Sequence, residues 1–317
     1  MPKKNKTAPA RGQLTIGLPR ALLYARYGTL WLTFFEKLGI QTLVSEPTTL
    51  ETLNRGSDRA IDEMCLAVKI YLGHVDSLVG KCDYILVPRI SNFGVRRAMC
   101  TTFEGMYDIC CNVYRRSGQK FLAYNVDVDL GHDEMTAFFA MAGEIGVPVN
   151  EALVAYRAAK KAEARAWKAR LEEQEALAKC PGLKVLVAAH SYVAEDEYIG
   201  KPITDFLHGA GVTALRADIV DRKAALKQSE KFSPTMRWEL SREIAGGICQ
   251  YGERVDGIIL LSVFPCGPDA MTSDIYIRRL KGVPILNLVL DAQSGMAGVE
   301  TRLESFVDIL RFKHGEL

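Results

Sequence analysis

The chain has 317 residues, of which 48% are hydrophobic and 25% are charged, and this composition is typical of a folded protein with enough apolar surface for two packed cores. The net charge is only +2, from 40 basic and 38 acidic residues, so no overall positive field indicates nucleic acid as a partner. No apolar run approaches the roughly 18 residues of a membrane span, and no apolar signal segment precedes the first strand, so we expect a cytoplasmic protein that does not enter a membrane.

The first part of the chain alternates short β-branched runs with longer amphipathic stretches. This alternation indicates right-handed βαβ units and a parallel sheet. We predict a disordered tail over residues 1–13. The strands predicted after it are Leu14–Leu18, Ile40–Ser45, Tyr84–Pro88 and Phe121–Val126. The predicted helices are Ala21–Leu38, a continuous or broken segment over Asp58–Val79, Glu104–Ser117 and Asp133–Gly146.

A long segment rich in Ala, Glu, Lys and Arg, Glu151–Lys179, predicts a solvent-washed helix that links two lobes. After it the alternation restarts. The predicted strands are Lys184–Ala189, Val212–Leu215, Gly257–Ser262 and Pro284–Leu290. The predicted helices are Pro202–Gly209, Thr235–Tyr251, Ala270–Leu280 and Val299–Lys313.

The pattern therefore predicts an α/β protein with two doubly wound lobes that face each other. We place the N-terminal lobe at residues 14–150, the linking helix at 151–180 and the C-terminal lobe at 181–317. Ligands of such sheets bind at the carboxyl ends of the strands, so we expect the functional cleft there.

Eight cysteines are spread along the chain. Because the cytosol keeps thiols reduced, we expect packed side chains, metal ligands or reactive thiols rather than a disulfide framework. Cys266 directly follows the most hydrophobic strand of the second lobe, in a Pro-Cys-Gly-Pro loop that precedes a helix. This position predicts a cleft-facing thiol whose pKa is lowered by the helix N-terminus. A buried cysteine in a tight turn is the alternative.

Cys100 follows the strand that ends at Pro88, in a polar loop that is also expected to face the cleft. Cys65 lies among Met, Leu and Val in a segment of helical period, which by itself favours core packing. We expect the other cysteines to pack, with Cys110 or Cys111 as the first exception. Three thiolates on separate loops match neither zinc-ribbon pairs nor clustered ferredoxin motifs, so their spacing alone is a weak signal. The five packing cysteines are Cys82, Cys110, Cys111, Cys180 and Cys249.

Two nucleotide motifs are missing from the sequence. There is no GxxxxGK[ST] loop for ATP hydrolysis, and the first βα turn lacks the GxGxxG pattern of NAD-binding folds. Their absence favours a protein that receives electrons over one that generates them from a nucleotide.

Several short motifs occur in order along the chain. They are Ile16–Tyr24 (IGLPRALLY), Cys65–Lys69 (CLAVK) followed by Gly73-His74, then Pro88-Arg89, Cys100, and Phe264–Asp269 (FPCGPD). Together they resemble the 2-hydroxyacyl-CoA dehydratase and benzoyl-CoA reductase superfamily, and more specifically the domain of unknown function found in its activase-related proteins. The resemblance covers most of the chain, from about Leu14 to Leu310.

This resemblance implies two flavodoxin-like lobes with an iron–sulfur cluster between them, either a 4Fe-4S cluster or the double-cubane cluster of some relatives. It assigns Cys65, Cys100 and Cys266 as the ligands. It also implies an ATP-hydrolysing activator as electron donor, and a small-molecule or acyl-CoA substrate. Ala67 and the Thr101-Thr102 pair replace the Pro and Pro-Lys of relatives, so no substrate can be carried over.

The residues that follow Cys65 suggest candidate catalytic side chains. On a continuous helix Lys69 would share the face of Cys65 and offset thiolate charge, and His74 would donate a proton near the cluster; we therefore predict both as catalytic. A solvated lysine and a capping histidine are the alternatives. Arg20 and Arg89, at the ends of the first and third strands, are expected at the cleft mouth, where they hold an anion or form rim salt bridges.

These observations leave three functions open. The first is an iron–sulfur reductase or dehydratase component that accepts low-potential electrons under anaerobic conditions. The second is a non-catalytic electron carrier or cluster scaffold that docks to a partner enzyme. The third is a clusterless binding module with cysteines as filler. Whether the chain is an enzyme, and whether it forms a homodimer or heterodimer, is not decided by the sequence.

Overall fold

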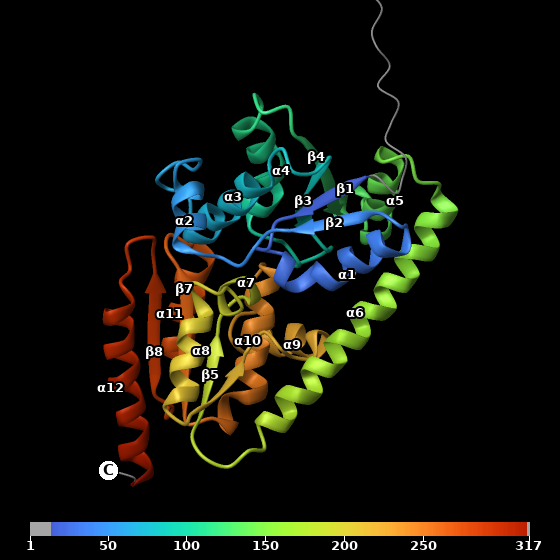
Figure 1. Ribbon diagram of the computed structural model, residues 1–317. Coiled ribbons are helices and arrows are strands. Elements are labelled where there is room, and N and C mark those ends of the chain that lie inside the picture. The colour runs from blue at the N-terminus through green and yellow to red at the C-terminus, as the bar shows by residue number, and fades with distance from the viewer. Residues whose placement is uncertain (1–13, 316–317) are drawn as a thin grey trace, which may run out of the picture.

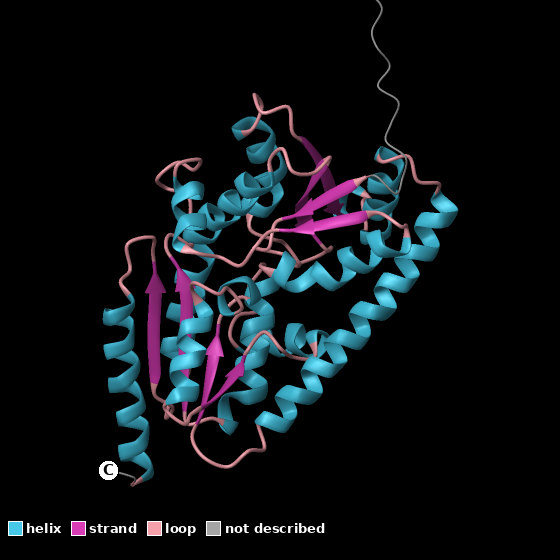
Figure 2. Cartoon of the chain, viewed as in Figure 1, coloured by secondary structure: helices cyan, strands magenta, loops and turns pink. Residues whose placement is uncertain are grey.

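The structure, a computed structural model, describes residues 14–315, so the predicted tail over residues 1–13 lies outside the described residues. Two four-stranded parallel sheets form the framework, each flanked by helices (Figures 1 and 2). The predicted α/β class with two flavodoxin-like lobes is therefore confirmed. The strands of the first lobe are β1 (Thr15–Leu18), β2 (Gln41–Val44), β3 (Tyr84–Asn92) and β4 (Lys120–Asp127). The strands of the second lobe are β5 (Lys184–Ala188), β6 (Thr213–Arg216), β7 (Gly257–Val263) and β8 (Ile285–Leu290).

Helices fill the connections between the strands and cover the sheets. Those of the first lobe are α1 (Tyr24–Lys37), α2 (Leu50–Ser57), α3 (Leu66–Leu78), α4 (Thr101–Val113) and α5 (Glu134–Glu144). The long helix α6 (Val149–Leu177) runs down one side of the molecule from the first lobe to the second (Figure 1). The second lobe contains α7 (Ser191–Ala194), α8 (Gly200–Gly209), α9 (Arg222–Gln228), α10 (Glu239–Tyr251), α11 (Gly267–Arg279) and α12 (Met296–His314).

The two sheets share one topology. Their strand orders are β2-β1-β3-β4 and β6-β5-β7-β8, so the chain changes direction between β1 and β3 and again between β5 and β7. In open parallel sheets the crevice at this switch point is the usual binding place. The arrows of β5, β7 and β8 point toward the first lobe, which brings the carboxyl ends of the second sheet to the junction of the lobes (Figures 1 and 2).

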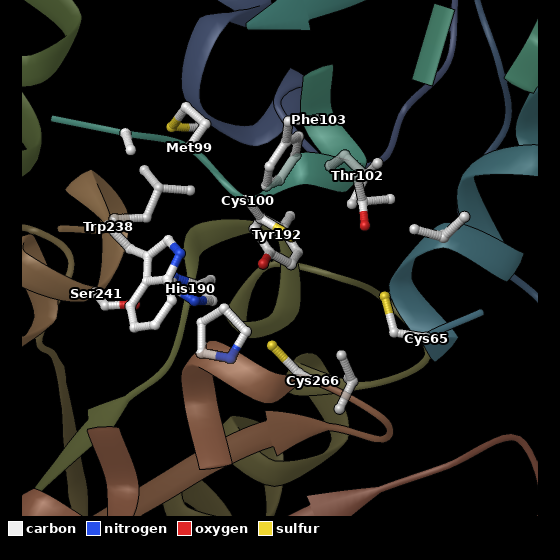
Figure 3. A pocket seen from close by; sticks show the side chains of 16 residues that line it. Cys65, Met99, Cys100, Thr102, Phe103, His190, Tyr192, Trp238, Ser241 and Cys266 are labelled. Carbon is white, nitrogen blue, oxygen red and sulfur yellow. The ribbon is translucent and has the colours of Figure 1, made fainter. Parts of the chain in front are cut away.

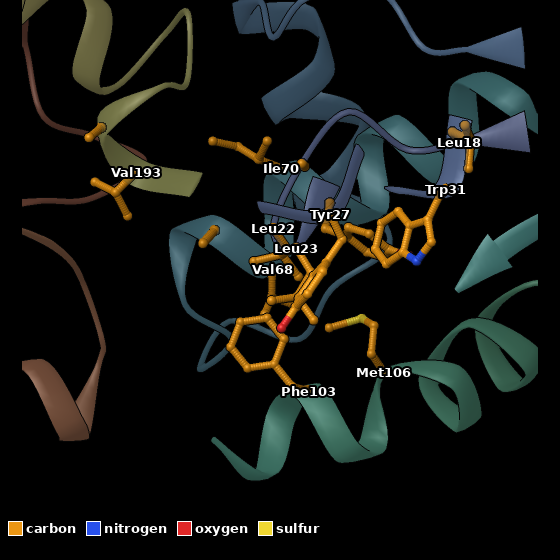
Figure 4. Close-up of a cluster of buried hydrophobic side chains, with 14 of the residues drawn as sticks. Leu18, Leu22, Leu23, Tyr27, Trp31, Val68, Ile70, Phe103, Met106 and Val193 are labelled. Atoms are coloured by element: carbon orange, nitrogen blue, oxygen red, sulfur yellow. The ribbon is translucent and has the colours of Figure 1, made fainter. Parts of the chain in front are cut away.

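The buried apolar residues of the described part of the chain form two clusters, and the boundary between the clusters does not follow the lobes. The larger cluster contains the core of the first lobe and one face of the second sheet, while the smaller lies under α10 on the other face. Figure 4 shows part of the larger cluster, in which Tyr27 and Trp31 of α1 gather with Val68 of α3 and Phe103 of α4. A continuous apolar core therefore joins the lobes behind the crevice.

The elements differ from the prediction mainly between residues 45 and 66. The predicted helical segment Asp58–Val79 is wrong in its first part, because α3 begins only at Leu66 and the preceding residues form turns after α2. Helices α2, α7 and α9 were not predicted. Strand β3 continues through Pro88 to Asn92; β1 pairs with it only at Tyr84 and Ile85, so no ladder bond to β1 is lost at Pro88. Among the described residues no helix is both long and apolar enough to cross a membrane.

Candidate functional site, a three-cysteine pocket at the lobe junction

A cavity of about 50 Å³ lies between the switch points of the two sheets and is lined by Cys65, Cys100 and Cys266 (Figure 3). Cys100 comes from the loop after β3 and Cys266 from the loop after β7, as strand-end positions predict. Cys65 reaches the cavity from the start of α3. The rest of the lining is largely apolar: Leu22, Val68, Ala98, Met99, Thr102, Phe103, His190, Tyr192, Trp238, Leu240, Ser241, Val263 and Pro268.

Each of the three cysteines is the N-cap residue of a helix. Cys65 caps α3, Cys100 caps α4 and Cys266 caps α11, all with extended backbone. His190 and Trp238, which also line the cavity, cap α7 and α10. The N-terminal end of a helix carries unpaired N–H groups and partial positive charge. Helix α7 has only four residues, but the N-termini of the four longer helices α3, α4, α10 and α11 meet at this cavity, and their fields favour a negatively charged occupant.

Backbone hydrogen bonds tie the cysteine loops of the two lobes together. The Leu66 N–H, next to Cys65, donates to the carbonyl of Phe264, two residues before Cys266, over 3.0 Å. The Ala98 N–H donates to Arg237 O over 3.0 Å, and the Glu239 N–H donates back to Ala98 O over 2.9 Å. The cysteine positions are thus fixed across the junction by the fold itself.

The thiols differ from the sequence expectation in their acidity. We expected a lowered pKa for Cys266, but this is wrong: burial raises the pKa, and the neighbouring carboxylate of Asp269 raises it further. Burial also raises the pKa of Cys65, although the backbone amides of Val68 and Ala67 act in the opposite direction. The helix N-termini are therefore outweighed by the apolar surroundings, and both thiols keep their protons in the chain as it stands.

Three residues of the pocket region were missed by sequence reasoning. His190 Nε2 lies 2.8 Å from Asp269 Oδ1, and both side chains are less than 10% exposed. The His190 ring stacks on Tyr192 with ring centroids 5.2 Å apart. His190 directly follows Ala188-Ala189 at the carboxyl end of β5, so the strand-end rule that found Cys100 and Cys266 would have found His190 as well.

The predicted catalytic residues lie outside the lining of the cavity. Lys69 is half-buried on α3, and its Nζ donates to the carbonyl of Asp62 over 3.1 Å. Cys65 is the N-cap of α3, and its carbonyl accepts a hydrogen bond from the Lys69 N–H over 3.1 Å, so the helix begins between the two residues.

His74 lies in a separate hydrogen-bond network. It is 1% exposed, and its ring nitrogens contact the hydroxyls of Ser45 and Thr48 at 2.8 and 3.0 Å. Burial, assisted by Arg20, lowers the His74 pKa to about 4. The ring is therefore uncharged near neutral pH, and both of its nitrogens are hydrogen-bonded.

The two predicted cleft arginines form ion pairs. Arg20 Nη2 lies 3.4 Å from Glu197 Oε1 across the lobe junction, at the edge of a neighbouring polar cavity of about 300 Å³. Arg89 Nη2 lies 3.5 Å from Asp108 Oδ2 within the first lobe. Both arginines therefore form salt bridges, as the second of the two expectations has it; Arg20 does so at a cavity edge, whereas Arg89 pairs with a residue of α4.

The other five cysteines do not line the cysteine cavity. Cys110 is fully buried in the core of the first lobe, and Cys180 is exposed after α6. Within residues 14–315, no three His, Cys, Asp or Glu side chains converge tightly enough to hold a single metal ion.

Comparison with known proteins gives one family. The family described as CoA enzyme activase uncharacterised domain matches residues 15–220, which include all of the first lobe, α6 and the start of the second lobe. Two of the three pocket cysteines, Cys65 and Cys100, fall in the matched part. No curated protein matches the chain.

Proposed function

The chain belongs to the CoA enzyme activase uncharacterised domain family, and from this premise we propose that it binds an iron–sulfur cluster through Cys65, Cys100 and Cys266, as proteins of the 2-hydroxyacyl-CoA dehydratase type do. One observation carries the proposal: three cysteines far apart in the sequence, and no others, line one cavity among the described residues. Their number supports a single 4Fe-4S cluster over a double-cubane cluster, which needs more ligands.

The donor set fits such a cluster. A single ion needs all its thiolates within about 2.3 Å of one point, and the described side chains offer no such group. A cluster instead takes each thiolate on a different iron atom, so wider spacing suits it. The partial positive charge of the N-termini of α3, α4, α10 and α11 offsets the negative charge that a thiolate-bound cluster brings into an apolar cavity.

When bound, the cluster would accept one electron at low potential, delivered by the ATP-hydrolysing activator that the resemblance to 2-hydroxyacyl-CoA dehydratases implies. The chain's own residues hold and shield it. Met99, Phe103 and Trp238 form an apolar wall that keeps water from the thiolates. The catalytic roles of Lys69 and His74 stay predictions, as do the domain boundaries at residues 150 and 180.

A second function, a non-catalytic electron carrier or cluster scaffold, is favoured by the small size of the cysteine cavity. The cavity measures about 50 Å³ and backbone hydrogen bonds join the lobes beside it, so an acyl substrate would have to occupy the adjoining cavities that share Tyr192 or Cys266. Electron-resonance spectra of the reduced protein distinguish the two functions. Spectra that change on addition of acyl-CoA thioesters support an enzyme, and unchanged spectra support a carrier.

The cluster itself is tested by purifying the protein without oxygen and measuring iron, sulfide and visible absorption. We expect a brown protein with about four iron atoms per chain. Cys65→Ala, Cys100→Ala and Cys266→Ala should each lose most of the iron, whereas Cys180→Ala, at an exposed position outside the cavity, should keep it. A wild-type protein that stays iron-free after reconstitution, or a Cys266→Ala variant with full iron content, contradicts the proposal.

A further inference from the structure

Tyr192 is the second residue of α7 and lies where the cysteine cavity meets the neighbouring polar cavity, both of which it lines. Figure 3 shows its hydroxyl oxygen directed into the space between Cys100 and Cys266. Burial raises the pKa of Tyr192, and the carboxylate of Asp269 raises it further. The phenol therefore keeps its proton and is a hydrogen-bond donor facing the thiols.

Two aromatic neighbours hold the Tyr192 ring. The His190 ring stacks on it with 20° between the planes, and Phe103 meets it edge-on with centroids 5.8 Å apart. His190 is fixed in turn by its 2.8 Å contact with Asp269. Stacked and edge-on contacts of this kind restrict the ring to one orientation. The direction of the hydroxyl is thus determined before anything binds in the cavity.

The hydroxyl of Tyr192 has no hydrogen-bond partner in the described part of the chain. Among the buried tyrosines, Tyr114 and Tyr276 donate to backbone carbonyl oxygens over 2.9 and 3.1 Å, whereas the hydroxyls of Tyr71 and Tyr124 have no partner among the described residues. Tyr192 differs from Tyr71 and Tyr124 in that it is only partly buried and lines a cavity, so its hydroxyl is accessible to a bound acceptor. The donor is therefore available to a group that enters the cavity.

We propose that Tyr192 donates a hydrogen bond to a sulfur atom of the cluster held by Cys65, Cys100 and Cys266, and that His190 is the positioning residue for its ring. This inference rests on the proposed function. A hydrogen bond to sulfur stabilises the more negative, reduced state, so it raises the reduction potential of the cluster. Tyr192 would then set how readily the protein accepts an electron.

The test uses anaerobically loaded protein and two readouts, iron content and reduction potential. Tyr192→Phe keeps the ring and its contacts but removes the donor, so we expect unchanged iron content and a shift of the potential to a more negative value. His190→Gln keeps a donor for Asp269 but removes the stacking ring, and should shift the potential in the same direction by less. Tyr198→Phe, a tyrosine that lines neither cavity, should leave both readouts unchanged.

A second measurement needs only the wild-type protein. Electron–nuclear double resonance of the reduced cluster should reveal an exchangeable proton that disappears in D₂O. Absence of that proton, or an unchanged potential in loaded Tyr192→Phe, overturns the role of Tyr192 and leaves cluster binding intact. Iron-free wild-type protein overturns the proposed function, and the role of Tyr192 with it.

Discussion

The directions of the hydrogen bonds around the buried His74 ring define its tautomer. Thr48 donates its hydroxyl hydrogen to Asp196, so its oxygen accepts from His74 Nε2–H, and Nδ1 is left to accept from Ser45. Ser45 Oγ in turn accepts from the Arg20 N–H over 2.8 Å. The neutral ring thus links the loop after β2 to Asp196 of the second lobe.

This network predicts a loss of stability in acid. The His74 pKa is about 4 in the folded chain, below its ordinary 6.5, so between these values the unfolded chain binds a proton that the folded chain does not. Folding stability therefore falls as pH decreases from 6.5 to 4. His74→Gln removes this titration, so the stability gap between wild type and variant should shrink by about 3 kcal/mol between pH 7 and pH 4.

Urea unfolding at several pH values measures this gap. Thr52→Ala, which removes a helix-capping hydroxyl and no titratable group, serves as the control, because its cost of about 1 kcal/mol should not change with pH. A gap for His74→Gln that stays constant or widens in acid would show that His74 is not the group that titrates.

At the residue scale, sequence reasoning located thiols better than their surroundings. Strand-end positions indicated Cys100 and Cys266, whereas Cys65 was assigned only through the family resemblance. Asp269 and Tyr192 could not be recognised as pocket residues, because their importance comes from contacts with His190 that only tertiary structure creates. The acidity of Cys266 was predicted with the wrong sign, since burial depends on side chains from both lobes.

At the element scale, the start of α3 depends on its crossing with α2. A Cβ atom added at Gly73 would lie 1.9 Å from the carbonyl oxygen of Thr52, and one added at Gly56 would lie 1.7 Å from that of Lys69. The two helices are therefore in backbone contact, which only glycine allows. Because Cys65 caps α3, this crossing also sets the position of a pocket thiol.

Gly73→Ala should consequently lower the free energy of unfolding by about 3 kcal/mol, since a rigid backbone must move to admit the methyl group. It should also reduce iron loading. Gly143→Ala, at an exposed α5 position with nothing within 4 Å of the added atom, should instead raise stability by about 0.5 kcal/mol. Denaturant unfolding compares the two variants. Equal stabilities would refute the close crossing.

Helix and strand prediction succeeded where the periodic pattern is long. Helix α6 was expected at Glu151–Lys179 and occupies Val149–Leu177. Helix α2 was missed because its capping box pairs Thr49 with Thr52, without the Glu or Gln that usually marks this motif in a sequence. Helix α7 has only four residues and is defined by its contacts rather than by a pattern.

At the scale of the whole molecule, an ion pair closes the junction beside the pocket. Arg97 of the first lobe donates through Nε and Nη2 to both carboxylate oxygens of Glu239, at 2.8 and 2.7 Å. The Glu239 side chain is 1% exposed, whereas that of Arg97 is 42% exposed. Removing the arginine therefore leaves a carboxylate buried at the start of α10 without its partner.

Arg97→Met should lower the free energy of unfolding by about 2 kcal/mol, less than a fully buried pair would cost, because solvent already screens the arginine. Lys168→Met is the matched control: its partner Glu172 is 67% exposed, and its loss should change stability by less than about 0.5 kcal/mol. Thermal and urea unfolding measure both variants. If Arg97→Met is as stable as the control, the pair does not join the lobes.

The topology of each lobe followed from the alternation of strands and helices, but the way the lobes meet did not. Their junction depends on single contacts, such as the hydrogen bond from Leu66 N–H to Phe264 O. The spacing of hydrophobic residues in the sequence does not predict such contacts. The apolar core that runs from one lobe into the other could not be predicted from the sequence either. A buried strand has the same run of apolar residues whichever lobe covers it.

Cluster binding should act on this junction directly. Cys65 and Cys100 belong to the first lobe and Cys266 to the second, so a cluster held by all three bridges the lobes and binds only the folded chain. Loading with iron and sulfide should therefore raise the unfolding temperature of the wild type. The stabilisation grows with the logarithm of the ratio of free ligand concentration to dissociation constant.

Anaerobic scanning calorimetry before and after reconstitution measures this shift. Cys266→Ala should show little or no shift, because the second lobe then contributes no ligand and the bridge is lost. Cys249→Ala should shift like the wild type, since that thiol lies outside the cavity. A full shift in Cys266→Ala would mean that the bound iron is held within the first lobe alone, and that the junction is stabilised only by the hydrogen bonds and ion pairs of the chain.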